Sequence, residues 1–141
     1  MISCTRRLHF CSGHRVVGHE NKCANVHGHN YVVFIEAEAE LDGIGRVIDF
    51  SVLKEKIGGW LDEFWDHTFI AYDAEDPELL RAIQKINNKL VYRLPANPTA
   101  ENMAQYLLTV VCPLVLEGTG VTVTTIEIWE TENCKATASI K

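Results

Sequence analysis

The sequence has no long hydrophobic run and no excess of basic residues. No apolar stretch is long enough to span a bilayer, so we expect no membrane-spanning segment. The formal net charge is −6, from 13 Lys and Arg against 19 Asp and Glu. That balance argues against nucleic acid or an anionic membrane as the main partner. The first residues lack the apolar run of a secretory signal, and we expect none.

The five cysteines show no repeated spacing, and their number is odd. A disulfide framework needs paired cysteines, so this pattern does not indicate one. We therefore expect a reducing, cytoplasmic location. The length of 141 residues, with 47% apolar and 23% charged residues, is typical of one globular domain, which we expect to cover residues 1–141.

A pair of histidines, His27 and His29, runs directly into a predicted strand at residues 30–40. Residues two apart in a strand point to the same face. Both imidazoles therefore lie on the face that continues as Tyr31, Val33 and Ile35. Two imidazoles aimed at one point indicate a metal site, and Cys23 precedes them by four residues. In the alternative interpretation, one histidine is a hydrogen-bonded core residue and the other is half exposed.

A third histidine could come from the preceding strand, predicted at about residues 5–17. That strand contains His9 and His14, an odd and an even position. Both can point inward only if Gly13 marks a bulge or bend. Periodicity alone does not choose between them.

The remaining pattern predicts an α+β fold in which helices cover one face of an antiparallel sheet. Residues 15–22 are expected to form a loop, and residues 46–50 a short strand that makes a hairpin with strand 30–40. Helices are predicted from Ser51 as N-cap to about residue 64, from Pro77 to residue 86, and from Asn97-Pro98-Thr99 onward, with Pro113 expected to kink or end the last one. Further extended segments are expected at 89–94, 121–130 and 135–141, with a turn at 118–120.

Two acidic positions, Asp66 and Glu130, allow two interpretations each, and a third, Glu101, has a structural explanation. Asp66-His67 at a helix end is either a solvated cap or a carboxylate that orients an imidazole for proton transfer. Glu101 falls in the first turn of a helix, where the dipole alone favours a carboxylate. Glu130 shares a face with Ile126 and Ile128, so it lies at an exposed sheet end or contacts a ligand.

Taken together, six motifs resemble the 6-pyruvoyltetrahydropterin synthase and 6-carboxytetrahydropterin synthase family. They occur in the family's order and span nearly the whole chain. They are Phe10-Cys-Ser-Gly-His14, Cys23-x-x-x-His27-Gly-His29, Val47-Ile-Asp-Phe50 with Leu53-Lys54, Asp66-His67, Asn97-Pro-Thr-Ala-Glu101-Asn102 and Trp129-Glu130-Thr131.

This resemblance implies a tunnelling fold, in which ββααββ units join edge to edge into an oligomeric barrel, expected as a hexamer built from two trimers. It implies a Zn²⁺ ion held by His14, His27 and His29. It also implies roles for other residues. Cys23 would abstract the proton, Asp66 and His67 would form a relay, Glu130 would hold the pterin ring, and Thr99 and Glu101 would line the substrate pocket.

The gap of three residues between Cys23 and His27 is similar to that of bacterial carboxytetrahydropterin synthases of queuosine biosynthesis. The expected substrate is 7,8-dihydroneopterin triphosphate, cleaved to 6-carboxytetrahydropterin with loss of acetaldehyde and triphosphate. Arg15, Lys22 and Lys54 are candidate triphosphate ligands. One alternative is a 6-pyruvoyltetrahydropterin synthase that eliminates triphosphate, and another is a non-catalytic pterin- or metal-binding module.

Two features depart from the family pattern. Cys11-Ser12-Gly13 stands where small residues led by serine are usual. The segment of about residues 73–94 is longer than in compact members, which bears on the preference for the substrate side chain.

Overall fold

The computed structural model describes residues 2–140, and its centre is a pair of long antiparallel strands. β1 (Ser3–His14) pairs with β2 (His27–Glu38) along the whole length of both. Burial alternates along each strand, so Phe10, Tyr31 and Val33 face inward while their neighbours face outward. This alternation matches the period of two predicted from the sequence.

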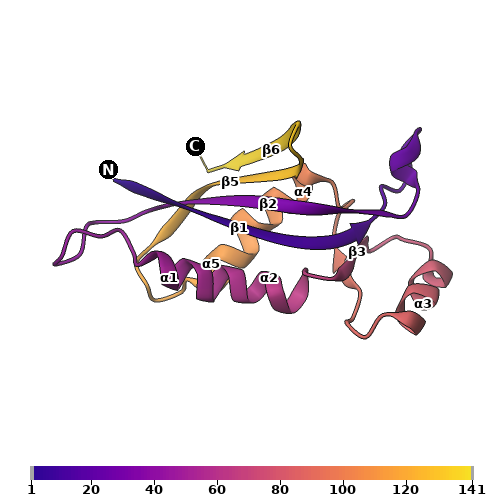
Figure 1. Ribbon diagram of the computed structural model, residues 1–141, viewed down its shortest axis with the longest axis horizontal. Coiled ribbons are helices and arrows are strands. Elements are labelled where there is room, and N and C mark those ends of the chain that lie inside the picture. The colour runs from indigo at the N-terminus through magenta and orange to yellow at the C-terminus, as the bar shows by residue number, and fades with distance from the viewer. Residues whose placement is uncertain (1, 141) are drawn as a thin grey trace.

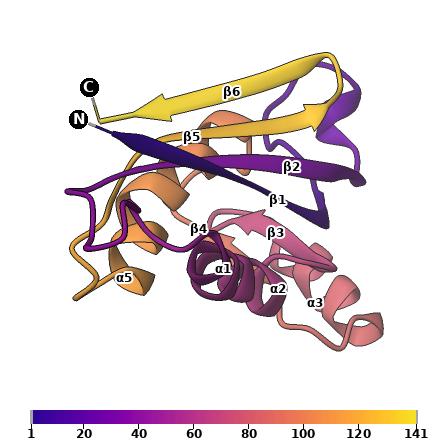
Figure 2. The same cartoon turned by 60° about the vertical axis from the view of Figure 1, so that its left-hand side comes forward.

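Four further strands extend this pair into a six-stranded sheet (Figures 1 and 2). The spatial order is β4 (Tyr92–Leu94), β3 (Thr68–Tyr72), β1, β2, β5 (Thr122–Thr131) and β6 (Cys134–Ser139). The neighbouring strands β1, β2, β5 and β6 pair in antiparallel fashion. By contrast, β3 pairs with β1 in parallel, and β4 pairs with β3 in parallel.

Two long helical segments cover one face of the sheet (Figure 2). The first consists of α1 (Phe50–Leu53), a π turn at Lys54–Gly58 and α2 (Gly59–Phe64). The second consists of α4 (Ala100–Tyr106), a π turn at Leu107–Val111 and α5 (Cys112–Val115). A separate helix, α3 (Pro77–Ile86), lies at one end of the molecule (Figure 1). The main core lies between the sheet and the two long segments and includes Ile35, Leu53, Ile57, Trp65, Met103, Leu107 and Ile126.

The predicted strand at 46–50 and its hairpin with β2 are wrong. Asp42 accepts hydrogen bonds from the backbone N–H groups of Ile44 and Arg46, which closes a turn. Asp49 then caps α1 by accepting from Ser51 N, so Asp49 rather than Ser51 is the N-cap. Side chains that satisfy nearby backbone groups compete with strand pairing, and here they divert the chain into the helix.

The sheet is mixed rather than wholly antiparallel, and the sequence interpretation missed β3 as a strand. Thr68, Phe69, Ile70 and Ala71 are all buried, as is typical of a parallel strand covered on both faces. A continuous apolar run directly after a helix carries no period of two, so periodicity could not separate it from the helix end. β3, α3 and β4 therefore extend the fold beyond a simple ββααββ unit, and Phe69, Ala71 and Leu80 form a second, smaller core cluster there.

Pro113, expected to kink or end this helix, does not end it, because the chain stays helical to Val115. The π turn before Pro113 brings Cys112 N to Leu107 O. This wider turn accommodates a proline that would lose a bond and clash inside a regular α-helix. The helix starts predicted at Pro77 and Asn97-Pro98-Thr99 are confirmed, with Asp76 and Thr99 as N-caps.

All five cysteines are unpaired thiols. Within residues 2–140, no helix is both long and apolar enough to cross a membrane.

Candidate active site

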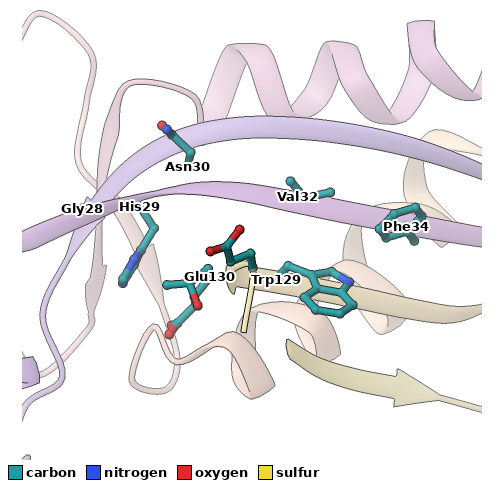
Figure 3. A pocket seen from close by; sticks show the side chains of 9 residues that line it. Gly28, His29, Asn30, Val32, Phe34, Trp129 and Glu130 are labelled. Carbon is teal, nitrogen blue, oxygen red and sulfur yellow. The ribbon is translucent and has the colours of Figure 1, made fainter. Parts of the chain in front are cut away.

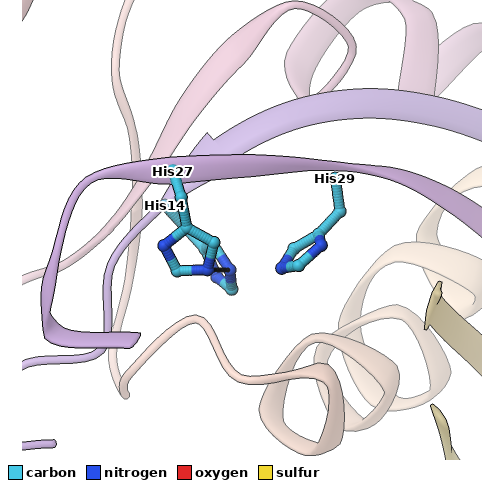
Figure 4. A group of neighbouring side chains, drawn as sticks. All are labelled: His14, His27 and His29. Atoms are coloured by element: carbon cyan, nitrogen blue, oxygen red, sulfur yellow. Dashed lines mark hydrogen bonds between the residues drawn. The ribbon is translucent and has the colours of Figure 1, made fainter. Parts of the chain in front are cut away.

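Three histidine rings converge at the end of the β1–β2 pair (Figure 4). The register places His14 opposite His27, and Ser12 opposite His29. Residues directly opposite one another share a face, so the three rings point to the same side of the sheet. Their centroids lie 4.6–5.1 Å apart. One ring nitrogen from each histidine lies within 4.8 Å of the other two, which is close enough to hold a single metal ion.

Backbone carbonyls fix two of these rings. The Nδ1 atom of His14 lies 2.6 Å from Pro98 O, and that of His27 lies 2.7 Å from Asn25 O. Because carbonyls only accept, both Nδ1 atoms carry the proton and donate, which leaves the Nε2 lone pairs free. The two Nε2 atoms lie 3.1 Å apart. Two lone pairs at this separation repel unless a cation lies between them, so the donor set fits a metal ion.

His14 is suited to ligation because it stays neutral. Burial lowers its pKa to about 4; the Pro98 hydrogen bond opposes this shift, and the neighbouring His27 and His29 add to it. Burial also lowers the pKa of His29, although the nearby charge of Glu130 acts in the opposite direction. A neutral imidazole is the form that binds metal.

The glycine between the two β2 histidines is required by packing against β1. A Cβ atom at Gly28 would lie 2.9 Å from the backbone oxygen of Ser12. Any side chain at this position would push β2 away from β1, and so would separate His27 and His29 from His14. The His-Gly-His pattern thus reflects the close approach of the two strands.

The structure separates His9 from the cluster. His9 is exposed on the other face of β1, opposite Val32 of β2. No bulge occurs at Gly13, which pairs in regular register with Gly28. Simple alternation therefore places His14 inward and His9 outward, the choice that the family resemblance implied.

Glu130 of β5 lies beside this cluster. It is half-buried, and its charge acts on both His29 and Tyr31. Burial, reinforced by Glu130, raises the pKa of Tyr31, so its hydroxyl stays protonated. A cavity of about 630 Å³ opens here between β2 and β5 (Figure 3). Its lining consists of Gly28, His29, Asn30, Val32, Phe34, Trp129, Glu130, Thr131 and Glu132.

Asp66 and His67 form a hydrogen-bonded pair at the turn between α2 and β3. Asp66 Oδ2 lies 2.9 Å from His67 Nδ1, and Asp66 Oδ1 accepts from Cys11 N at 2.8 Å. Burial acts to raise the pKa of Asp66, but the bonds from Cys11 and His67 outweigh it and lower the pKa below its usual range. His67 adopts a positive φ of 56° while its N–H donates to Cys11 O. Both residues of the pair are therefore held by the backbone of Cys11 in β1.

His67 borders a hollow that also reaches two histidines of the cluster. The side chain of His67 is 77% exposed, and the hollow is lined as well by Cys11, Ser12, Gly13, His27, Gly28, His29 and Asn30. The three imidazoles of the cluster point to the inner face.

Cys23 lies in a 3-10 turn, Lys22–Ala24, four residues before His27. It is partly buried, and no residue in the range 2–140 hydrogen-bonds its sulfur. Its carbonyl accepts a hydrogen bond from Val16 N at 2.8 Å, so the loop between β1 and β2 continues the hairpin at this point.

The segment around Thr99 and Glu101 begins α4 and also holds the β1–β2 loop. Thr99 caps α4 by accepting from Asn102 N, and Glu101 is exposed in the first turn. Asn97 binds both backbone groups of Val17, at 2.9 and 3.0 Å, and so holds the β1–β2 loop. Sequence reasoning gave Asn97 no such role, although its place one residue before Pro98 is a signal that could be used.

The three candidate phosphate ligands have different surroundings. Arg15 uses its guanidinium nitrogens on Glu75 and Ala24 O. Lys22 is exposed in the β1–β2 loop. Lys54 lies along a groove that also includes Arg6, Arg7 and His67.

Three kinds of comparison relate this chain to known proteins. The sequence model of the 6-pyruvoyl tetrahydropterin synthase family matches residues 3–140. A protein of Rickettsia bellii named 6-carboxy-5,6,7,8-tetrahydropterin synthase is 43% identical over 135 residues, which cover 95% of this chain and 97% of that protein. A protein of the same name from Haemophilus influenzae is 30% identical, covering 93% of this chain and 94% of its own.

Solved structures share the fold. The structure of Caenorhabditis elegans 6-pyruvoyl tetrahydropterin synthase superposes with a TM-score of 0.69 at 24% identity, covering 99% of this chain and 96% of that one. An uncharacterised protein of Wolinella succinogenes gives a TM-score of 0.86 at 23% identity, covering 99% and 98%.

Proposed function

Because this chain belongs to the 6-pyruvoyl tetrahydropterin synthase family, we propose that it is a zinc-dependent 6-carboxy-5,6,7,8-tetrahydropterin synthase. It converts 7,8-dihydroneopterin triphosphate and one water molecule to 6-carboxytetrahydropterin, acetaldehyde and triphosphate. The product name follows from the relatives, which carry it at up to 43% identity. The observation that carries the proposal is the three-histidine cluster, with Glu130 at the edge of the adjoining cavity.

The donor set favours zinc in a catalytic rather than a structural role. Three neutral imidazoles supply three ligands, and a tetrahedral zinc ion then keeps a fourth position for substrate. Zinc bound here would polarise a substrate oxygen and lower the pKa of a hydroxyl attached to it. No protein ligand besides His14, His27 and His29 is required by this assignment.

Glu130 holds the pterin ring in this proposal. An ionised carboxylate accepts two N–H donors side by side, which matches the guanidine-like edge of a pterin. A cavity of about 630 Å³ falls in the size range of sites for small ligands. Thr99 and Glu101 are the further substrate contacts that the family resemblance implies, and neither lines this cavity.

Cys23 is the base that removes a proton from the substrate side chain. A thiol acts as a base only as the thiolate, so it needs a cation or an imidazole nearby. Asp66 keeps His67 in one orientation through Nδ1, which leaves Nε2 to exchange the proton with Cys23 or the substrate. Asp66 is thus the orienting member of the relay, and His67 is the member that transfers the proton.

The outer strands of the sheet support an oligomer in which sheets join edge to edge into a barrel. Within residues 2–140, β4 and β6 are the outermost strands of the sheet, and edge-to-edge joining covers strands of this kind. We propose a hexamer built from two trimers, and light scattering at micromolar concentration tests it, because a monodisperse 15.9 kDa species contradicts the proposal.

Product analysis tests the activity itself. The zinc-loaded protein is incubated with 7,8-dihydroneopterin triphosphate, and the products are identified by mass spectrometry. A 6-carboxy pterin with acetaldehyde supports the proposal. A pterin that keeps its three-carbon side chain identifies the 6-pyruvoyl reaction instead, and binding without any product leaves a non-catalytic module.

A further inference from the structure

A buried ion pair links the residue after His14 to the longer segment 73–94. Arg15 donates to Glu75 through Nε at 2.9 Å and through a terminal nitrogen at 2.7 Å. The Glu75 side chain is 1% exposed, whereas that of Arg15 is 27% exposed. The Arg15 hydrogen bonds lower the pKa of Glu75, so the pair is ionised at neutral pH. A two-bond contact of this kind fixes both distance and angle.

The other side of Arg15 holds the loop that carries Cys23. Its remaining terminal nitrogen donates to Ala24 O at 3.1 Å, and Val16 N donates to Cys23 O at 2.8 Å. Residues 15 and 16 therefore bind the carbonyls of two consecutive residues, Cys23 and Ala24. Each guanidinium nitrogen of Arg15 thus makes a hydrogen bond within the chain.

Glu75 is itself held in place by hydrogen bonds to the end of β3 and the start of α3. Its N–H donates to Tyr72 O at the end of β3, and its Oε1 accepts from Asp76 N at 2.9 Å. Asp76 in turn is the N-cap of α3. A continuous series of contacts thus runs from β3 and α3 through Glu75 and Arg15 to the Cys23 loop. In Figure 1, this loop and α3 lie at the same end of the molecule.

We propose that Glu75 is a positioning residue, which acts through Arg15 to hold Cys23 at the distance its proton transfer requires. This inference rests on the proposed function in one respect, the role of Cys23 as base. It also gives segment 73–94 a structural role, because this segment carries Glu75, which binds the Arg15 side chain that contacts the β1–β2 loop. Glu75 does not touch the substrate.

The test compares Glu75→Gln with Glu78→Gln in the zinc-loaded protein. The glutamine side chain keeps the shape of Glu75 but loses the charge and one acceptor, whereas Glu78 is an exposed residue with a loose 3.9 Å contact to Arg81. We expect Glu75→Gln to lower kcat about 10–100-fold with KM nearly unchanged, the usual effect of a misplaced catalytic group. Zinc content should stay the same, and Glu78→Gln should match the wild type.

A second readout reports on the loop without using activity. Alkylation of Cys23 by iodoacetamide, followed by mass spectrometry with buried Cys112 as internal reference, should be several-fold faster in Glu75→Gln. Hydrogen exchange at Val16 N should speed up in parallel. If Glu75→Gln does not fold, Arg15→Lys gives the same two readouts, because it keeps the charge and loses the two-bond contact.

Each other result overturns the inference. Faster alkylation of Cys23 with a normal kcat means that the Arg15–Glu75 pair only stabilises the fold. A raised KM with a normal kcat means that Arg15 contacts the substrate. An unchanged alkylation rate means that the pair does not hold the loop. Failure of the proposed base is recognised separately, because Cys23→Ala would then stay active while the loop readout of Glu75→Gln still changed.

Discussion

The histidine cluster and the two turns that carry Cys23 and His67 are fixed in different ways. The cluster rests on two long strands in regular register, with backbone carbonyls orienting His14 and His27. Cys23 and His67 lie in short turns instead. Arg15, which is paired with Glu75, holds the turn of Cys23. Asp66 holds the imidazole of His67. The backbone of the strands therefore holds the three imidazoles, whereas hydrogen bonds from neighbouring side chains hold the turns of Cys23 and His67.

The largest effect should come from removing the cluster. His27→Ala together with His29→Ala should reduce bound zinc from about one ion per chain to background, because one imidazole cannot hold the ion. Turnover should disappear with it. Metal analysis by mass spectrometry measures the loss, and His9→Ala is the matched control that should keep its metal. Full zinc occupancy in the double variant would disprove the assignment.

A smaller effect should come from the proton-transfer side. Cys23→Ala should keep zinc and pterin binding but lose turnover about 10²–10⁴-fold, the usual contribution of a positioned base. Single-turnover kinetics and zinc analysis on the same sample give both quantities. Near wild-type turnover with intact metal would transfer the role of base to His67 or to another group.

The regular register of the strands can be tested at Gly28. Gly28→Ala should destabilise the fold by about 1–3 kcal/mol, because the new Cβ meets Ser12 O at 2.9 Å. It should also weaken zinc binding, since β2 must shift. Gly43→Ala, whose Cβ meets nothing within 4 Å, is the control in urea unfolding. Equal midpoints for the two variants would mean that the strands can separate at no cost.

The smallest effect should be a pH dependence from Glu75. The Arg15 hydrogen bonds lower its pKa from the ordinary value of 4.5, so the folded state holds the ionised form more tightly than the unfolded state does. This stability is fully present above pH 4.5 and is lost as pH falls through the lower pKa of the folded state. Urea midpoints of wild type and Glu75→Gln should therefore converge on acidification. A constant difference between them would contradict this expectation.

The sequence by itself determined the local part of the site. Alternation along residues 27–35 placed His27 and His29 on one face, because the period of a strand is a property of the backbone. The helix starts at Pro77 and Thr99 followed from capping chemistry in the same way. The ordered motifs indicated the family that the comparisons show.

Only the tertiary structure decided what depends on contacts between distant residues. It selected His14 over His9 through the β1–β2 register, and it replaced the expected hairpin at 46–50 with a capped helix. It also placed β3 in the sheet and turned Arg15 toward Glu75, 60 residues away in sequence. Local propensity does not contain such pairings, because their free energy comes from burial and hydrogen bonds that form only after the chain has folded.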